Sequence, residues 1–277
     1  MSQVQQERLP LKKAPVPREG FWSNWGWILG FSVLLVVGSL LYTLIMSWDA
    51  LTSGDILQNL LRIVGEMFPP DLTVIMTLGK PIVETLAMSV MSTLLAVAIA
   101  FPLSFLAAET TSVHPTVRYC VKGLFNALRT IPELILAIIF VASVGFGILP
   151  GILALGIHSV GMLGKFYAEA IDKVDRGLIE AVESCGGSRF HTIVFSVIPQ
   201  ILSHSIDFSL YRWEYNFRAS TVVGMIGAGG VGFQLIASLR IMQYQEVLAI
   251  LIAVFVMVQF VDAFGNAIRN RLISQER

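Results

Sequence analysis

PIVETLAMSVMSTLLAVAIAFPLSFLAA, residues 81–108, contains a single charged side chain, Glu84, near its start. A helix needs about 20 apolar residues to cross the hydrocarbon core of a bilayer. Residues 81–108 exceed that length, and apolar runs of this kind are too long for the core of a soluble domain. We therefore expect residues 81–108 to cross a membrane.

The composition of the whole chain also indicates a membrane protein. Of its 277 residues, 55% are hydrophobic and 14% are charged, and the mean hydropathy is +0.73, whereas a soluble domain is about 25% charged. These values exclude a soluble enzyme and a disordered chain, and two cysteines do not make a disulfide scaffold. The net charge is +0, so no basic surface indicates nucleic-acid binding. We expect an all-α integral membrane protein without an added soluble domain.

Further apolar runs bring the expected total to about six transmembrane helices. The first run, residues 27–48, follows a basic stretch as a signal peptide does, but its core is too long and no small-x-small cleavage site follows, so we expect an uncleaved span. The other spans are residues 131–149, extended backwards by the amphipathic stretch 117–129, then 152–167 after a turn at Leu149-Pro150-Gly151, a fifth beginning near Ile193, and 247–267.

The uneven distribution of lysine and arginine sets the expected orientation. With six spans, most basic residues and both termini lie on the cytoplasmic side, and the outside holds Arg62, Lys80 and Arg240. The amphipathic stretch 49–80 is expected to lie along the outer membrane surface as a helix and then turn. The chain thus divides into a cytoplasmic segment, residues 1–26, and a transmembrane domain, residues 27–277, with its core at residues 81–268.

A cytoplasmic loop, residues 170–195, contains a short amphipathic segment. Residues 176–185 predict a helix with Leu178, Ile179 and Val182 on one face, stopped at Gly186 because glycine fits the left-handed position after a helix. Such a helix either rests on lipid headgroups or shows its apolar face to a protein partner. Both interpretations are compatible with the pattern itself.

The same loop carries a spaced motif. Glu180-Ala181-Val182 stands three intervening residues before Gly186, and Ser196-Val197-Ile198-Pro199 follows nine residues later. This resembles the cytoplasmic "EAA" loop of ABC importer permeases, with Val182 in place of the usual second alanine and a partial match at the Ile-x-Leu-Pro end. Three further motifs, beginning at Arg129 (RTIPEL), Tyr211 (YRWEYNFR) and Ser220 (STVVGMIGAGGVG), look like the phosphonate-transporter permease subgroup. The resemblance covers roughly residues 81–271.

The resemblance implies a type I importer permease fold in the bacterial cytoplasmic (inner) membrane. It implies a dimer with a second copy of the chain, two separate ATPase subunits and an extracytoplasmic substrate-binding protein. The implied cargo is phosphonate or a related phosphorus oxyanion such as phosphite, hypophosphite or phosphate. Glu180, Ala181, Val182 and Gly186 would then form the ATPase coupling helix. The sequence has no G-x-x-x-x-G-K-[ST] motif, so we expect ATP and Mg²⁺ on the partner ATPase and no cofactor on this chain.

Ionisable residues inside the fifth span fall on one helical stripe. The stripe consists of Asp207, Tyr211, Glu214, Arg218 and Thr221, and Ser220 could add a hydroxyl beside it. Charged groups within spans face water or pair with one another. The stripe therefore predicts either the lining of a translocation path or a structural Glu214–Arg218 pair, and Arg212, off the stripe, is expected to contact a neighbouring helix or the second copy. An alternative function is an ion-coupled secondary transporter using Asp207, Glu214 and Arg218, although the paired broken helices of such proteins are not recognisable.

A glycine motif follows the stripe. Gly227, Gly229, Gly230 and Gly232 fit G-x-G-x-x-G, but a dinucleotide site requires a βαβ unit, which membrane spans do not provide. We interpret the motif as a candidate gate or as close helix packing. The histidines lack metal-ligand spacing, and His158, alone in its span, is expected to be hydrogen-bonded in packing. No metal site and no catalytic residues are predicted.

Overall fold

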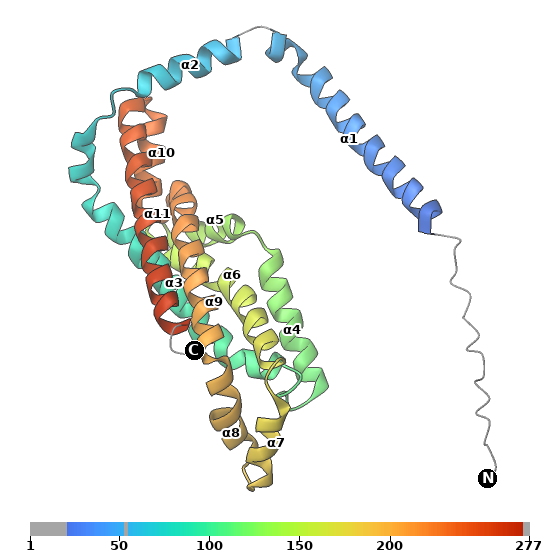
Figure 1. The fold of residues 1–277 in the computed structure, drawn as a ribbon. Coiled ribbons are helices and arrows are strands. Elements are labelled where there is room, and N and C mark those ends of the chain that lie inside the picture. The colour runs from blue at the N-terminus through green and yellow to red at the C-terminus, as the bar shows by residue number, and fades with distance from the viewer. Residues whose placement is uncertain (1–20, 53–54, 274–277) are drawn as a thin grey trace, which may run out of the picture. The chain divides into compact units, whose positions relative to one another are not determined.

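The computed structural model describes residues 21–52 and 55–273, and these residues contain helices and no strand (Figure 1). The prediction of an all-α protein is therefore confirmed. The chain separates into two units, residues 1–62 and residues 63–277. Most of the expected cytoplasmic segment, residues 1–20, lies outside the described residues.

The first unit contains α1 (Phe21–Thr52) and most of α2 (Asp55–Met67). Within α1, Gly26–Trp48 is long and apolar enough to cross a membrane, in agreement with the first predicted span. Helix α2 is amphipathic and lies within residues 49–80, where the sequence predicted an amphipathic helix. The chain then turns at Pro69 into the short helix η1 (Leu72–Thr77), which Asp71 caps by accepting a hydrogen bond from the Thr73 amide at 2.9 Å. The Thr73 hydroxyl and amide together lower the pKa of Asp71.

The second unit is a bundle of apolar helices. Its principal members are α3 (Gly79–Ala107), α4 (Pro115–Thr130), α5 (Glu133–Val144), α6 (Ile148–Ile171), α9 (Ile198–Val223), α10 (Gly230–Arg240) and α11 (Tyr244–Ile273). Helices α3, α6 and α9 pack against one another at the centre, and α11 lies along α9 (Figure 1). Over the described residues of both units, five helices can cross a membrane, or six when the bent pair α4–α5 counts as one span, which matches the prediction of about six.

Glycines on α6 allow α3 and α4 to approach its backbone. A Cβ atom at Gly161 would stand 2.6 Å from the Phe125 carbonyl oxygen of α4, and one at Gly156 would stand 2.7 Å from Leu95 Cδ2 of α3. Small residues serve this purpose in membrane helices, where association depends on van der Waals packing. The core of the second unit therefore depends on α6 having no side chain at these positions.

Replacing Gly161 by alanine tests this packing. The backbone oxygen of Phe125 cannot rotate away, so the change should destabilise the protein by about 1–3 kcal/mol, the usual cost of overpacking. Gly123 on α4 is a matched control because a Cβ there meets nothing within 4 Å. We expect the thermal unfolding midpoint of the purified protein to fall for Gly161→Ala and to stay or rise for Gly123→Ala. Equal midpoints for the two variants would contradict the packing described here.

The third predicted span is broken rather than straight. Helices α4 and α5 meet at an angle of 84° at Ile131 and Pro132. Proline has no amide hydrogen and disfavours a helical residue before it, and Ile131 is accordingly extended, with φ −81° and ψ 119°. The His158 side chain of α6 bonds the Ile131 carbonyl oxygen through Nδ1 at 3.2 Å. This is the packing role expected for His158. The histidine gives a hydrogen-bond partner to a carbonyl oxygen at the break between the two helices.

The turn before α6 also lies earlier than predicted. We expected it at Leu149-Pro150-Gly151, but these residues form the first turn of α6, where proline is tolerated. The connection instead uses Gly145 and Gly147, whose φ angles of 95° and 136° favour glycine. The third span consequently ends at Val144 rather than at Leu149.

Candidate functional site

The loop after α6 forms the predicted short helix, α7 (Arg176–Ser184). Asp175 caps its start by accepting a hydrogen bond from the Gly177 amide at 2.8 Å. At its end, Gly186 has φ 81°, and the amides of Gly186 and Gly187 bond the carbonyl oxygens of Glu183 and Val182. Glu180, Ala181 and Gly186 are exposed and Val182 is half-buried.

Helix α7 is followed by α8 (Arg189–Thr192) and the π-helix η2 (Ile193–Val197). A shallow apolar hollow of about 430 Å³ lies here, lined by Ala181, Val182, Cys185, Gly187, His191 and Phe195. Beside it, Leu178 and Phe190 are exposed to solvent. The α7–α8 end of the bundle, whose place in the fold Figure 1 shows, therefore presents an apolar surface that the described part of the chain does not cover.

Ion pairs join α9 to α11. Arg269 of α11 bonds Asp207 through Nε at 2.5 Å and approaches Glu214 through Nη2 at 3.4 Å. Arg218 bonds Asp262 of α11 at 2.8 Å. We call these five residues the α9–α11 ion-pair seam. The predicted intrahelical pair between Glu214 and Arg218 is not formed, because α11 supplies closer partners for both side chains.

The structure brings the charged members of the predicted stripe to α11 but separates the polar ones. Tyr211 is 51% exposed, and Thr221 is half-buried. The Ser220 hydroxyl is buried and donates to the Phe217 carbonyl oxygen of its own helix at 2.7 Å. A Cβ at Gly265 of α11 would stand 2.1 Å from Glu214 Oε1, so this glycine provides the room for the carboxylate.

A buried polar network that the sequence did not reveal lies among α3, α6 and α9. Arg212 donates through Nε to the Ser159 hydroxyl at 2.8 Å, and Ser159 is 3.1 Å from Asn216 Oδ1. Asn216 donates in turn to Thr93 at 2.9 Å. Arg212 therefore contacts neighbouring helices, one of the two expectations for it. An arginine in the middle of a span, off the charged stripe, was the available signal, but its partners on α3 and α6 lie far away in the chain.

Tyr215 connects Arg212 to the start of α5. The Arg212 guanidinium carbon lies 4.2 Å from the Tyr215 ring centroid, within cation–π range. The Tyr215 hydroxyl donates to Glu133 Oε1 at 3.1 Å. Glu133, the first residue of α5, is thereby joined to α9.

The glycine motif forms a tight turn between helices. Gly227, in the π-helix η3 (Gly224–Ala228), and Gly229 and Gly230 have positive φ angles. At the start of α10, the Gly230 amide donates to Glu84 Oε2 at 3.0 Å and the Val231 amide donates to Thr85 Oγ1 at 2.9 Å. The motif thus attaches α10 to α3, and a helix–turn–helix surrounds it rather than a βαβ unit.

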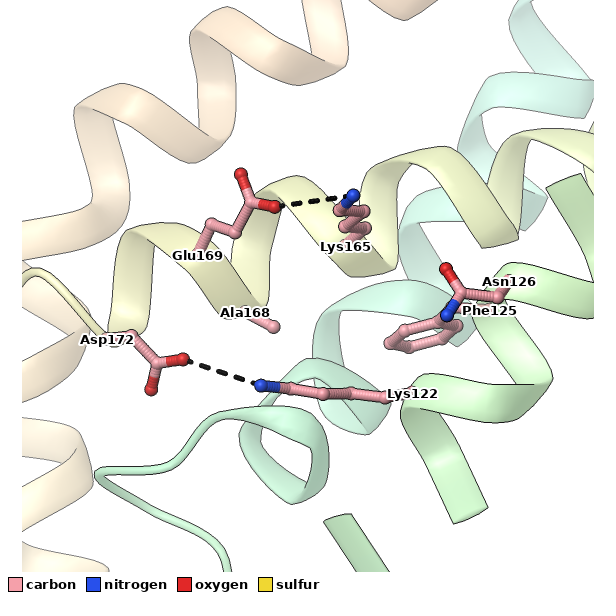
Figure 2. A pocket seen from close by; sticks show the side chains of 7 residues that line it. All are labelled: Lys122, Phe125, Asn126, Lys165, Ala168, Glu169 and Asp172. Carbon is pink, nitrogen blue, oxygen red and sulfur yellow. Dashed lines mark ion pairs between the residues drawn. The ribbon is translucent and has the colours of Figure 1, made fainter. Parts of the chain in front are cut away.

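A smaller hollow of about 140 Å³ lies between α4 and α6 (Figure 2). Lys122 faces Asp172 at 3.9 Å and Lys165 faces Glu169 at 3.7 Å, so both cations have carboxylate partners. Asp172 also accepts hydrogen bonds from the amides of Glu109 and Thr110, which attaches the α3–α4 loop to the end of α6. In residues 21–52 and 55–273 no group of three His, Cys, Asp or Glu side chains could hold a metal ion.

The described residues form a bundle of helices of which five, or six with the bent pair, can cross a membrane, so the fold is that of a multi-pass membrane protein. The chain belongs to the family described as binding-protein-dependent transport system inner membrane component, whose model matches residues 100–274. It is accordingly a multi-pass inner-membrane permease of an ABC importer and not an enzyme. Membership of this family decides against the alternative of an ion-coupled secondary transporter. The fold of an ABC importer permease implies ATPase and substrate-binding protein partners.

Individual proteins similar to this chain support the family assignment. The chain is 46% identical over 269 residues to the phosphite transport system permease protein PtxC of Stutzerimonas stutzeri, covering 95% of this chain and 96% of that protein. It is 38% identical over 241 residues to the phosphate-import permease protein PhnE of Mycolicibacterium smegmatis, covering 85% of this chain and 45% of that protein. A solved inward-facing MetNI methionine ABC transporter chain has a TM-score of 0.64 at 20% identity, covering 72% of this chain and 98% of that one, which shows the fold.

Proposed function

We propose that this permease imports a phosphorus oxyanion, with phosphite or phosphate as the nearest candidates and phosphonate and hypophosphite as variants. The similarity to the phosphite permease of Stutzerimonas stutzeri carries this proposal, because it extends over nearly the full length of both chains. The buried Arg212 and the exposed Arg218 of α9 are compatible with an anionic cargo.

ATP hydrolysis by the partner would be coupled to transport through α7. In this proposal Glu180, Ala181, Val182 and Gly186 dock into a partner ATPase that binds ATP and Mg²⁺, and two copies of the chain form a homodimer with two ATPase subunits. Closure of the ATPases on ATP would draw the two α7 helices together and turn the pathway outward by rigid-body movement. The uncovered apolar surface at α7 and α8 supports a protein partner there.

The pathway would run along α9. Tyr211, Arg218 and Thr221, which are exposed or half-buried, would face the cargo, with Ser220 behind them. Asp207 and Glu214 would hold the wall in place through Arg269. Gly227, Gly229, Gly230 and Gly232 would form a gate at the extracytoplasmic end, where the turn joins α10 to α3.

The proposed orientation, with both termini in the cytoplasm, makes a prediction about thiols. Cys120 and Cys185 are free and exposed. A membrane-impermeant maleimide should label both in inside-out vesicles that lack the ATPase, and neither in right-side-out vesicles. Adding the ATPase should protect Cys185, which lies beside α7, more than Cys120. Labelling of either thiol from the outside would overturn the orientation, and a Cys120→Ser, Cys185→Ser variant measures the background.

Purification of the assembled protein tests the partners. When the chain is co-expressed with the ATPase encoded beside it, a tagged permease should retain two ATPase copies and one untagged copy of itself. The mass of the complex measured by native mass spectrometry gives both numbers. A monomeric permease that retains no ATPase would contradict the proposed assembly.

A further inference from the structure

We propose that Arg212 is a cargo-binding residue inside the membrane, whose free guanidinium edge receives the phosphorus oxyanion during transport. The inference deepens the proposed function and rests on it, since an anionic cargo is required. Arg212 did not belong to the stripe predicted from the sequence, and its assignment depends on contacts in the folded protein.

Arg212 is a buried cation without a carboxylate partner. Its exposed fraction is 2%, and its Nη2 atom has no hydrogen-bond partner. In the described residues it takes part in no ion pair, whereas Arg218 and Arg269, in the α9–α11 ion-pair seam, pair with carboxylates of α11 and α9. An unpaired buried charge is costly, and ionisable groups kept inside a membrane usually serve a ligand or an ion.

The surroundings hold the guanidinium in one orientation. Ser159 of α6 accepts from Nε, and Ser159 is itself connected through Asn216 to Thr93 of α3. The Tyr215 ring covers one face of the guanidinium. These contacts use Nε and one face and leave Nη2 without a partner. Guanidinium groups bind tetrahedral oxyanions through such fixed N–H donors, and a braced donor loses little entropy on binding.

Helix α5 brings a carboxylate close to Arg212. Glu133 is the first residue of α5, directly after the 84° break, and its Oε1 atom is held by the Tyr215 hydroxyl. Its Oε2 atom is buried and has no partner, as Nη2 of Arg212 has none. Glu133 therefore contributes a nearby negative charge without forming the ion pair. Because Tyr215 belongs to α9, as Arg212 does, a shift of α5 would carry Glu133 away from both. Its negative charge would then no longer compete with an anion for Nη2, and the return of α5 would favour release.

Uptake by the complete complex, reconstituted with its ATPase and binding protein in proteoliposomes, tests the inference. Arg212→Met keeps most of the volume and removes the charge, so the complex should assemble but import labelled phosphite at least about tenfold more slowly, the loss expected for one charge-assisted bond. Arg212→Lys should retain part of the activity with a raised KM. The matched control is Trp213→Phe, which removes a buried unpartnered N–H from the neighbouring residue and should leave uptake unchanged.

The results separate the inference from the proposed function. Uptake at the wild-type level by assembled Arg212→Met would overturn the role of Arg212 alone, whereas a wild-type complex that imports no phosphorus oxyanion would overturn the proposed function as well. If Arg212→Met fails to assemble, uptake by a Ser159→Ala complex tests the role of Arg212 instead. Removing the hydroxyl that holds Nε should raise KM several-fold with little change in kcat. An unchanged KM in that variant would contradict cargo binding by Arg212.

Discussion

A complex carrying Gly186→Val should hydrolyse ATP but import little cargo. Gly186 ends α7 with φ 81°, a conformation that β-branched residues avoid. The strain of about 1–2 kcal/mol corresponds to roughly a tenfold loss of the ordered helix end, and uptake should fall by a similar factor. A Cβ at this position meets nothing within 4 Å, so the loss would come from the backbone and not from a collision.

The control for this prediction is Gly186→Asn. Asparagine enters the left-handed region more readily than valine, so this variant should retain most of the uptake. The measurement is the ratio of cargo imported to ATP hydrolysed, because this ratio separates loss of coupling from loss of the ATPase. A Gly186→Val complex with the wild-type ratio would show that the end of α7 does not transmit the ATPase movement.

Arg269→Gln should destabilise the membrane domain more than any other single change in the α9–α11 ion-pair seam. Arg269 is the partner of both Asp207 and Glu214, so its removal leaves two carboxylates without a cation, and Glu214 is buried. Breaking an ion pair from one side costs up to about 3–5 kcal/mol when both groups are buried, and the partial exposure of Asp207 reduces this to on the order of 2 kcal/mol. The thermal unfolding midpoint of the purified permease measures the effect.

The partner of Arg269 can be identified by a second substitution. Glu214→Gln in the Arg269→Gln background removes the buried carboxylate as well and should recover part of the lost stability, as coupled neighbours do. Arg218→Gln in place of Glu214→Gln is the matched comparison and should give no recovery, because Arg218 pairs with Asp262. No recovery with Glu214→Gln, together with a loss on Arg218→Gln that is larger in this background than in the wild type, would instead indicate the intrahelical Glu214–Arg218 pair that the sequence suggested.

The sequence predicted those parts of the fold that depend on local pattern. Apolar length identified the spans in α1, α3, α6 and α11, and the apolar face with its glycine identified α7. The 84° break was missed because apolar length was followed across Pro132, although the proline itself disfavours a continuous helix. Local sequence patterns thus predicted the straight apolar helices. Pro132 was also a local signal, for the break between α4 and α5, but the length of the apolar run was given more weight.

The site was less predictable because its contacts are distant in the chain. Helical spacing correctly placed Asp207, Glu214 and Arg218 on one face, but the choice between an i, i+4 pair and a partner on α11 depends on where α11 packs. The partner of Arg212 is Ser159, on another helix, and no spacing rule connects the two. Helix α10 was also missed, because its glycines indicated a turn and gave no helical pattern.

ATP-driven uptake is the most direct test of the central claim that this chain is the permease of an ABC importer for a phosphorus oxyanion. Proteoliposomes containing the permease and its ATPase, with the binding protein outside and ATP inside, would be given labelled phosphite in the absence of any ion gradient. We predict accumulation that requires both ATP and the binding protein and that unlabelled phosphate or methylphosphonate reduces by competition. Accumulation driven by a proton or sodium gradient without ATP would contradict the account.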